Sequence, residues 1–154
     1  MSYKIGIADT MFARVDMARL AEKTIKENKP ALDIVRYTVP GIKDLAVASK
    51  KLLEEDNCSI VIALGYVGKQ PLDNQCAHEA NMGLINAELA ANKHILKVFV
   101  HEEEKEDPEE FKTLIEDRTS KHTLNALKML EGKTALTNEA GQGKRQGSDD
   151  AGSL

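Results

Sequence analysis

Tryptophan is absent from this sequence, and its 154 residues include only three phenylalanines and three tyrosines. A core with so few aromatic rings must be mainly aliphatic, so an aromatic side chain at the end of a strand is a candidate for ligand binding. Cysteine is also scarce, since Cys58 and Cys76 are the only two. Two isolated cysteines exclude a disulfide framework and a CxxC site, and they favour a reduced, cytoplasmic compartment.

Long apolar runs and basic stripes are missing as well. A membrane-spanning helix needs about 20 consecutive apolar residues, and no run approaches that length. The formal net charge is -4 and no segment forms a basic stripe, so a nucleic-acid partner is not expected. The first residues, MSYKIGIAD, lead directly into a strand pattern, and no signal peptide is expected.

Apolar segments alternate with amphipathic segments along the chain. We expect strands at 3–9, 32–39, 59–65 and 95–101, and helices at 11–28, 41–52, 75–92 and 108–130. Asp9 or Thr10 is the expected N-cap of the first helix. This alternation predicts a flavodoxin-like α/β fold, a three-layer α/β/α sandwich around a four-stranded parallel sheet. Residues 1–131 are expected to form the single domain, and residues 132–154 a tail rich in glycine and charge that adds no core.

Several motif-like fragments fail on closer reading. GQGKRQG at 141–147 lacks the preceding strand and the glycine spacing of a dinucleotide loop, and GYVGKQ at 65–70 is not a phosphate-binding P-loop. AHEANM at 77–82 has methionine where a zinc protease needs its second histidine. No set of four zinc ligands occurs at regular spacing, so no metal site is predicted from the residues.

The carboxyl ends of the four expected strands are the natural place for a site. Ligands of open parallel sheets bind beyond these ends. Here the ends are residues 9–12, 38–44, 65–73 and 101–103, which we expect to lie side by side although they are far apart in the sequence.

Charged residues near these ends allow two interpretations each. Lys43 and Asp44 fit a salt-bridged surface turn, or a site where Gly41 and the helix start hold an anion or a carbonyl oxygen. His78, expected in the first turn of the third helix, fits a solvated helix start or a proton-transfer group. His101 and Glu102 fit a solvated turn or the same chemistry. Lys144 and Arg145 in the tail fit solvated charges or groups that grasp a phosphate or a neighbouring subunit's carboxylates.

Taken together, several ordered stretches resemble one family. FAR at 12–14, VPGIKDL at 39–45, ALG at 63–65 and HEANMGL at 78–84 are similar to stretches of lumazine synthases. CAHEA, VFVHE and the tail GQGKRQGSDDAG resemble the archaeal-type riboflavin synthases of that family. Two departures from lumazine synthase itself favour that sister group. The loop GYVGKQPLDNQ lacks the histidine that lumazine synthases use for proton transfer, and Lys43-Asp44 replaces their Phe-Glu.

The resemblance implies an enzyme that converts two molecules of 6,7-dimethyl-8-ribityllumazine into riboflavin and a ribitylaminopyrimidinedione. It implies a homopentamer with shared sites, no organic cofactor, and a divalent cation, magnesium, that the carboxylates of Asp44, Glu79 and Glu102 would hold indirectly. Lumazine synthase and a non-catalytic flavin-binding module are the alternatives.

The resemblance also implies roles for particular residues. Phe12 would stack on the substrate ring, and Lys43 would stabilise the developing anion with Asp44 orienting it. His78, His101 and Glu102 are unranked candidates for proton transfer. The expected substrate-binding residues are Phe12, Ala13, Arg14, Thr38, Val39, Pro40, Gly41, Ile42, Gly65, Tyr66, Val67, Lys144 and Arg145.

Overall fold

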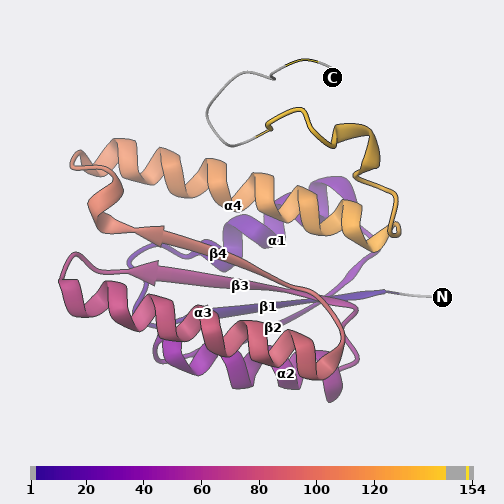
Figure 1. Cartoon of the computed structure of the whole chain (residues 1–154), viewed down its shortest axis with the longest axis horizontal. Helices are drawn as coiled ribbons and strands as arrows, with labels where there is room; N and C mark the ends of the chain where they lie inside the picture. Colours follow the sequence, from indigo (N-terminus) through magenta and orange to yellow (C-terminus); the bar gives the residue numbers. More distant parts are fainter. Residues whose placement is uncertain (1–2, 145–151, 153–154) are drawn as a thin grey trace.

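The structure is a computed structural model that describes residues 3–144 and residue 152. Its centre is a four-stranded, entirely parallel sheet with the strand order β2-β1-β3-β4 (Figure 1). The strands are β1 (Lys4–Thr10), β2 (Asp33–Val39), β3 (Ile60–Val67) and β4 (Ile95–His101). Because all four run the same way, their carboxyl ends meet at one edge, on the left in Figure 1.

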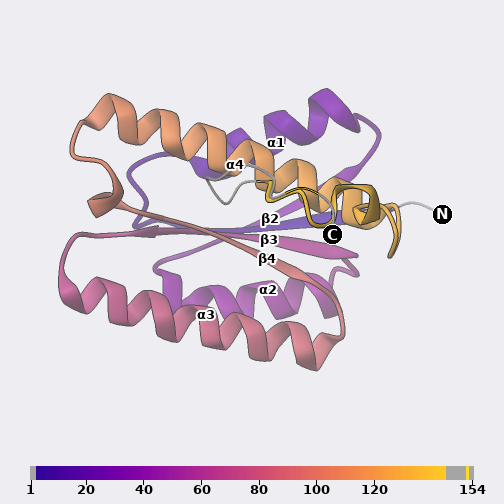
Figure 2. The same cartoon turned by 45° about the horizontal axis from the view of Figure 1, so that its top comes forward.

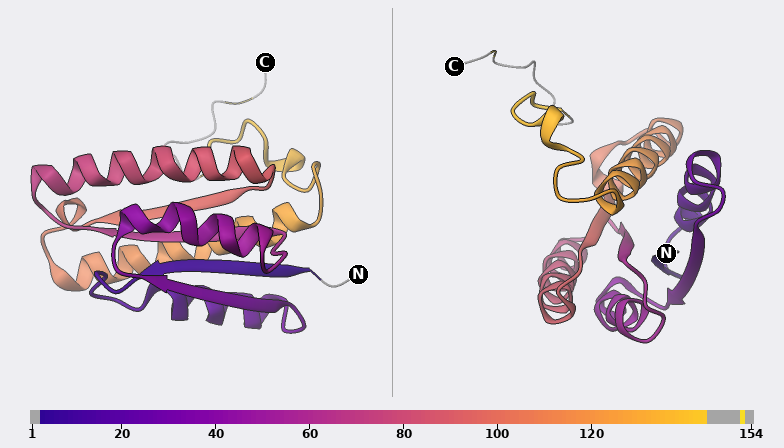
Figure 3. Two further views of the ribbon diagram at one scale, coloured as in Figure 1. Left: turned by 90° about the horizontal axis from the view of Figure 1, so that it is seen from below. Right: turned by 90° about the vertical axis from the view of Figure 1, so that its right-hand side faces the viewer.

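Two pairs of helices cover the two faces of this sheet. The helices are α1 (Met17–Asn28), α2 (Leu45–Glu54), α3 (Pro71–Ala91) and α4 (Pro108–Leu130), with short 3-10 turns η1 (Ile42–Asp44), η2 (Glu102–Glu104) and η3 (Thr137–Glu139). Helices α1 and α4 pack together on one face, and α2 and α3 pack together on the other (Figures 1 and 2). The view along the strands in Figure 3 shows the three layers, so the predicted α/β/α sandwich is confirmed.

The burial of each strand follows from its place in the sheet. All eight residues of the central strand β3 are buried, since both of its faces are covered by helices. The edge strand β2 is largely exposed and carries polar residues such as Arg36 and Thr38. Aliphatic side chains fill both halves of the core, with Ile7, Ile62 and Ile115 on the α1–α4 side and Leu52 and Leu84 on the other.

Helix α1 begins later than the sequence predicted. Its N-cap is Asp16, whose side chain accepts a hydrogen bond from the backbone N–H of Arg19. Neither Asp9 nor Thr10 caps it, because both are the last residues of β1 and their side chains bond elsewhere. The expected helix at 11–16 is therefore a loop, and this loop lies at the carboxyl edge of the sheet.

The predicted loop at 66–74 is also wrong. Strand β3 continues through Val67, since Tyr66 pairs with Val100 and Val67 pairs with His101. Helix α3 then starts at Pro71, which needs no hydrogen-bond donor in the first turn, and the Asp73 carboxylate accepts from the backbone N–H of Gln70. Only a short link, residues 68–70, separates the two elements.

The first part of the expected tail packs on helix α4. Glu139 pairs with Lys128 of α4 at 2.6 Å and with Lys144 at 2.8 Å. These two lysines hold the pKa of Glu139 down at about 2. Among residues 3–144 and 152, no helix is long and apolar enough to cross a membrane.

Candidate active site

Four segments that are distant in the sequence meet at the carboxyl edge of the sheet, as predicted. The loop after β1 is tied to the end of β2 by two backbone hydrogen bonds, Met11 N–H to Val39 O (2.8 Å) and Phe12 N–H to Pro40 O (3.2 Å). The ends of β3 and β4 are paired directly through Val67 and His101. Phe12, Lys43 and His101 therefore all lie at this one edge.

A cavity of about 450 Å³ opens at this edge on the α2–α3 side of the sheet. Its lining combines predicted residues with residues that the sequence analysis missed. The predicted residues are Phe12, Pro40, Gly41, Ile42, Lys43, Asp44, Tyr66 and Val67. The missed residues are Gly68, Asp73 and Cys76. Pro71 followed by Asp73 is a helix-start signal that would have brought the first turn of α3 to this edge.

A second cavity of about 300 Å³ lies on the α4 side of the same edge. Arg14 and Glu102 line it, and Tyr66 lines both cavities. Tyr66 is therefore the side chain that separates the two spaces. Both cavities are polar and apolar in part, which suits a ligand that combines a flat ring with a hydroxylated chain.

Tyr66 is held firmly in this position. Its side chain is only 4% exposed and its ring makes edge contacts with Phe12 (6.4 Å between centroids) and Phe111 (5.8 Å). Its hydroxyl donates to Glu102 Oε1 at 2.8 Å, and the same oxygen lies 3.6 Å from the Arg14 guanidinium. Burial, and then the hydrogen bond to the negative carboxylate, raise the pKa of Tyr66 to about 12. The phenol is therefore neutral at any physiological pH.

Lys43 and Asp44 do not act as a pair. The Lys43 ammonium binds Glu79 of α3 at 2.9 Å, which raises the pKa of Lys43 and lowers that of Glu79 through the same hydrogen bond. The Asp44 carboxylate instead accepts from the backbone N–H of Gly41 at 3.3 Å, closing the turn. The expectation that Asp44 orients Lys43 is wrong, because Glu79 does so.

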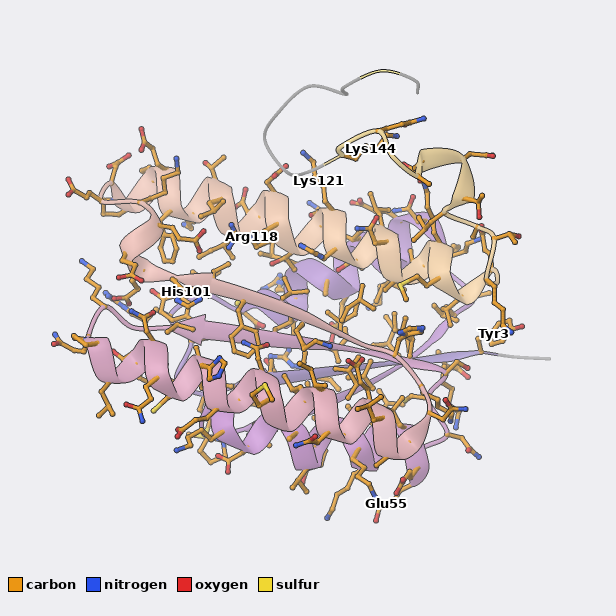
Figure 4. The ribbon with its side chains drawn as sticks, in the orientation of Figure 1. Tyr3, Glu55, His101, Arg118, Lys121 and Lys144 are labelled. Atoms are coloured by element: carbon orange, nitrogen blue, oxygen red, sulfur yellow. The ribbon has the colours of Figure 1, made fainter. Side chains whose placement is uncertain are left out.

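His101 has a defined hydrogen-bond arrangement. Its Nδ1 lies 3.0 Å from Asn74 Oδ1, and that oxygen can only accept. The neutral tautomer that suits this contact has its proton on Nδ1 and its lone pair on Nε2. The turn that follows is fixed by Arg118, which binds Glu104 with both terminal nitrogens at 2.8 Å. Figure 4 shows His101 at the carboxyl end of β4. His101 lies beside the two cavities without lining either.

Other predicted residues lie near the edge but outside the lining of both cavities. The Thr38 hydroxyl is committed to Asp9 Oδ1 at 2.6 Å, and Val39 is buried in the core. Ala13 packs against the core, and Gly65 lies so close to the Phe99 ring that a methyl group there would stand 2.6 Å from it. These residues support the carboxyl edge of the sheet without lining either cavity.

His78 and Lys144 lie away from the cavities. Because α3 begins at Pro71, His78 falls two turns into the helix and is exposed, outside both cavity linings. Lys144 binds Glu139 and lies over α4, well away from His101 in Figure 4. Within one chain, neither reaches this site. Arg145 lies outside the residues that the structure describes.

Comparison with known proteins matches the whole folded chain. The family model described as 6,7-dimethyl-8-ribityllumazine synthase covers residues 2–134. A riboflavin synthase of Methanothermobacter thermautotrophicus is 52% identical over 98% of this chain and 99% of its own. Riboflavin synthases of Aeropyrum pernix and Archaeoglobus fulgidus are 45% and 43% identical, over 97% and 98% of this chain and the same shares of their own. The chain therefore belongs to the lumazine synthase-like family, and along almost its entire length it is similar to the riboflavin synthases of archaea.

Proposed function

We propose that this protein is a riboflavin synthase. It would transfer a four-carbon unit between two molecules of 6,7-dimethyl-8-ribityllumazine, giving riboflavin and 5-amino-6-ribitylamino-2,4(1H,3H)-pyrimidinedione. The observation that carries this proposal is the similarity to riboflavin synthases at 43–52% identity along 97–98% of the chain. The aromatic-walled cavity at the carboxyl edge supports it, since the reaction needs a flat ring to be held in place.

The chemistry assigns tasks to the residues at this edge. One lumazine must lose a proton from its C7 methyl group, and a positioned base accelerates such a step. We assign this task to His101, because the tautomer that donates from Nδ1 to Asn74 has its lone pair on Nε2. Glu102 already binds the Tyr66 hydroxyl and faces Arg14, so we assign it to holding Tyr66 in place.

Binding and charge stabilisation fall to other groups. The half-exposed Phe12 ring offers a face for stacking at the cavity wall. Lys43 is the cation lining the 450 Å³ cavity, and it would stabilise negative charge that develops on the deprotonated ring. Its ion pair with Glu79 keeps its ammonium protonated and in place.

The experiment that tests the proposal supplies the purified protein with 6,7-dimethyl-8-ribityllumazine as its only substrate. A riboflavin synthase produces the green fluorescence of riboflavin together with one pyrimidinedione for each riboflavin. The family model carries the name of lumazine synthase, and an enzyme of that kind would be inert here and would require the pyrimidinedione plus a four-carbon phosphate. A non-catalytic flavin-binding module would bind the lumazine without turnover.

We further propose a homopentamer with sites shared between neighbours. Several large apolar side chains are exposed on the single chain, among them Met11 (76%), Val47 (62%) and Leu89 (73%). Burial of these side chains against a neighbouring chain would remove them from water. The exposed Phe12 and Arg14 would then meet a neighbouring chain that completes the binding site.

Magnesium remains a prediction from the resemblance. Among the described residues, no group of three or more histidine, cysteine, aspartate or glutamate side chains is arranged to hold a metal ion. The carboxylates of Asp44, Glu79 and Glu102 each have another partner, so no step is assigned to the metal. Assays after chelation, with and without added magnesium, test the requirement.

A cytoplasmic location is likewise proposed. Both Cys58 and Cys76 are free thiols, as expected in a reducing compartment.

A further inference from the structure

The loop at residues 11–16 contributes to both cavities at the edge of the sheet. Phe12 lines the larger cavity and Arg14 lines the smaller one. The loop has no helix or strand of its own. Between its ends it is held by packing of Ala13 on the core and by the contacts of Phe12 with Tyr66 and of Arg14 with Glu102. Its first residues are held by the backbone hydrogen bonds to Val39 and Pro40 described above.

One arginine connects the two ends of this loop. Arg36 Nη2 donates to Asp9 Oδ2 at 2.6 Å and to Asp16 Oδ1 at 2.9 Å. Asp9 lies just before the loop and Asp16 is its last residue, so one guanidinium bridges the start and the end. Arg36 itself is on the edge strand β2 and lines neither cavity.

The Asp9 end of this bridge is built into the core. Asp9 is only 5% exposed, and its other carboxylate oxygen accepts the Thr38 hydroxyl at 2.6 Å. A buried carboxylate requires such a complete set of partners. The hydrogen bond to Asp9 also raises the pKa of Arg36, so the guanidinium remains charged. Asp16 is the weaker and more exposed end, and it is also the N-cap of α1.

We propose that Arg36 is a positioning residue that sets the loop at 11–16, and with it Phe12 and Arg14, for substrate binding. The proposal rests on the proposed function of the protein. Arg36 acts through the loop and has no contact with the substrate. Asp9 anchors the guanidinium to the sheet, and Asp16 transmits its position to the far end of the loop. The bridge thereby fixes how far the loop stands from the end of β2.

The choice of variant decides whether the test is informative. Arg36→Met would leave Asp9 buried without its cation and threaten folding. Asp16→Ser is better, because serine caps a helix as well as aspartate does but has no carboxylate to pair with Arg36. Asp107→Ser is the control for loss of a cap, since Asp107 caps α4 by accepting from Glu110 N–H and, within the described part of the chain, has no hydrogen bond to residues 11–16. Its neighbours Glu106 and Pro108 line the smaller cavity, so this control is compared by hydrogen exchange and not by KM.

Two measurements on the whole chain test the role of Arg36. For Asp16→Ser we expect the KM for 6,7-dimethyl-8-ribityllumazine to rise about threefold to fivefold with kcat nearly unchanged, the size of effect of one partly exposed ion pair. Amide hydrogen exchange at residues 11–16 should become faster. Asp107→Ser should leave exchange at residues 11–16 unchanged.

The proposal is overturned if Asp16→Ser leaves exchange at residues 11–16 or KM unchanged, or if Asp107→Ser speeds exchange at residues 11–16 equally. Failure of the proposed function is distinct, since the wild-type protein would then make no riboflavin. The exchange measurement needs no substrate and still decides whether the Arg36 bridge holds the loop.

Discussion

Tyr66 lies between the two cavities at the carboxyl edge of the sheet. Its ring separates the cavity lined by Lys43 from the cavity lined by Arg14, and its hydroxyl is tied to Glu102. A phenol that is buried and hydrogen-bonded to a carboxylate is strongly disfavoured as an anion. We therefore interpret Tyr66 as a neutral wall and hydrogen-bond donor, with no role as a base.

This interpretation predicts the pH at which the Tyr66 hydroxyl loses its proton. The difference in phenolate absorbance between the wild type and Tyr66→Phe should have a midpoint near pH 12, the pKa raised by burial and Glu102. Because the folded pKa lies above the unfolded value of about 10, the stabilisation from Tyr66 is complete below pH 10. It should be lost as the pH rises toward 12. A difference midpoint close to 10 would show that the hydroxyl is neither buried nor bound to Glu102.

Lys43 gives a second prediction for a single residue. Lys43→Met should lower kcat about tenfold, less than the hundredfold or more reported for fully enclosed donors, because the side chain is more than half exposed. Steady-state rates of riboflavin formation measure this change. Lys50→Met is the matched control, since Lys50 pairs with Glu54 at 2.8 Å on the surface of α2. Equal losses in both variants would mean that Lys43 has no specific role in the reaction.

At the scale of elements, close packing between β3 and β4 stabilises the sheet next to its carboxyl edge. Gly65 lies against the Phe99 ring, and a methyl group there would stand 2.6 Å from the ring atoms. Gly65→Ala should therefore destabilise the fold by about 1–3 kcal/mol, as overpacking usually does. Gly41→Ala is the control for stability, because no atom lies within 4 Å of its added methyl group. Urea unfolding compares the two variants, and similar midpoints would contradict the tight contact.

The elements were predicted well in type and less well in their ends. The apolar run predicts strand β3, but the sequence pattern places its last two residues, Tyr66 and Val67, in a loop. Tyrosine followed by valine is ordinary strand sequence, and only the pairing with Val100 and His101 settles where the strand stops. The sequence predicts too early a start for helix α1. Asp16 is the N-cap, and its side chain also binds Arg36 on β2, a contact that the sequence alone does not reveal.

The sequence predicts candidate site residues from the ends of the strands. This prediction is confirmed for the segment that follows β2. Residues 40–44 line the larger cavity as expected. The sequence does not predict the partners that complete the site, because Asn74 and Asp73 belong to a helix start in a segment whose pattern indicates a loop. Ion pairs such as Lys43 with Glu79 join positions far apart in the sequence, and a single sequence does not reveal them.

At the scale of the whole molecule, the exposed parts of the surface include places where a neighbouring chain could bind. The edge strand β2 is exposed, and apolar side chains of α2 and α3, such as Val47, Met82 and Leu89, face outward. We predict that native mass spectrometry will find five chain masses. If neighbours share each site, specific activity should also fall on dilution to concentrations at which the assembly dissociates. A fully active monomer would contradict the shared site.

The most direct test of the account is a crystal structure with a lumazine analogue that binds but does not react. We predict that its ring lies in the cavity at the carboxyl edge, against Phe12 and Tyr66, with Lys43 and His101 nearby. A cavity lined by Lys128, Glu139 and Lys144 also lies between α4 and η3. A ring bound there, or anywhere else away from the carboxyl edge, would contradict the proposed site.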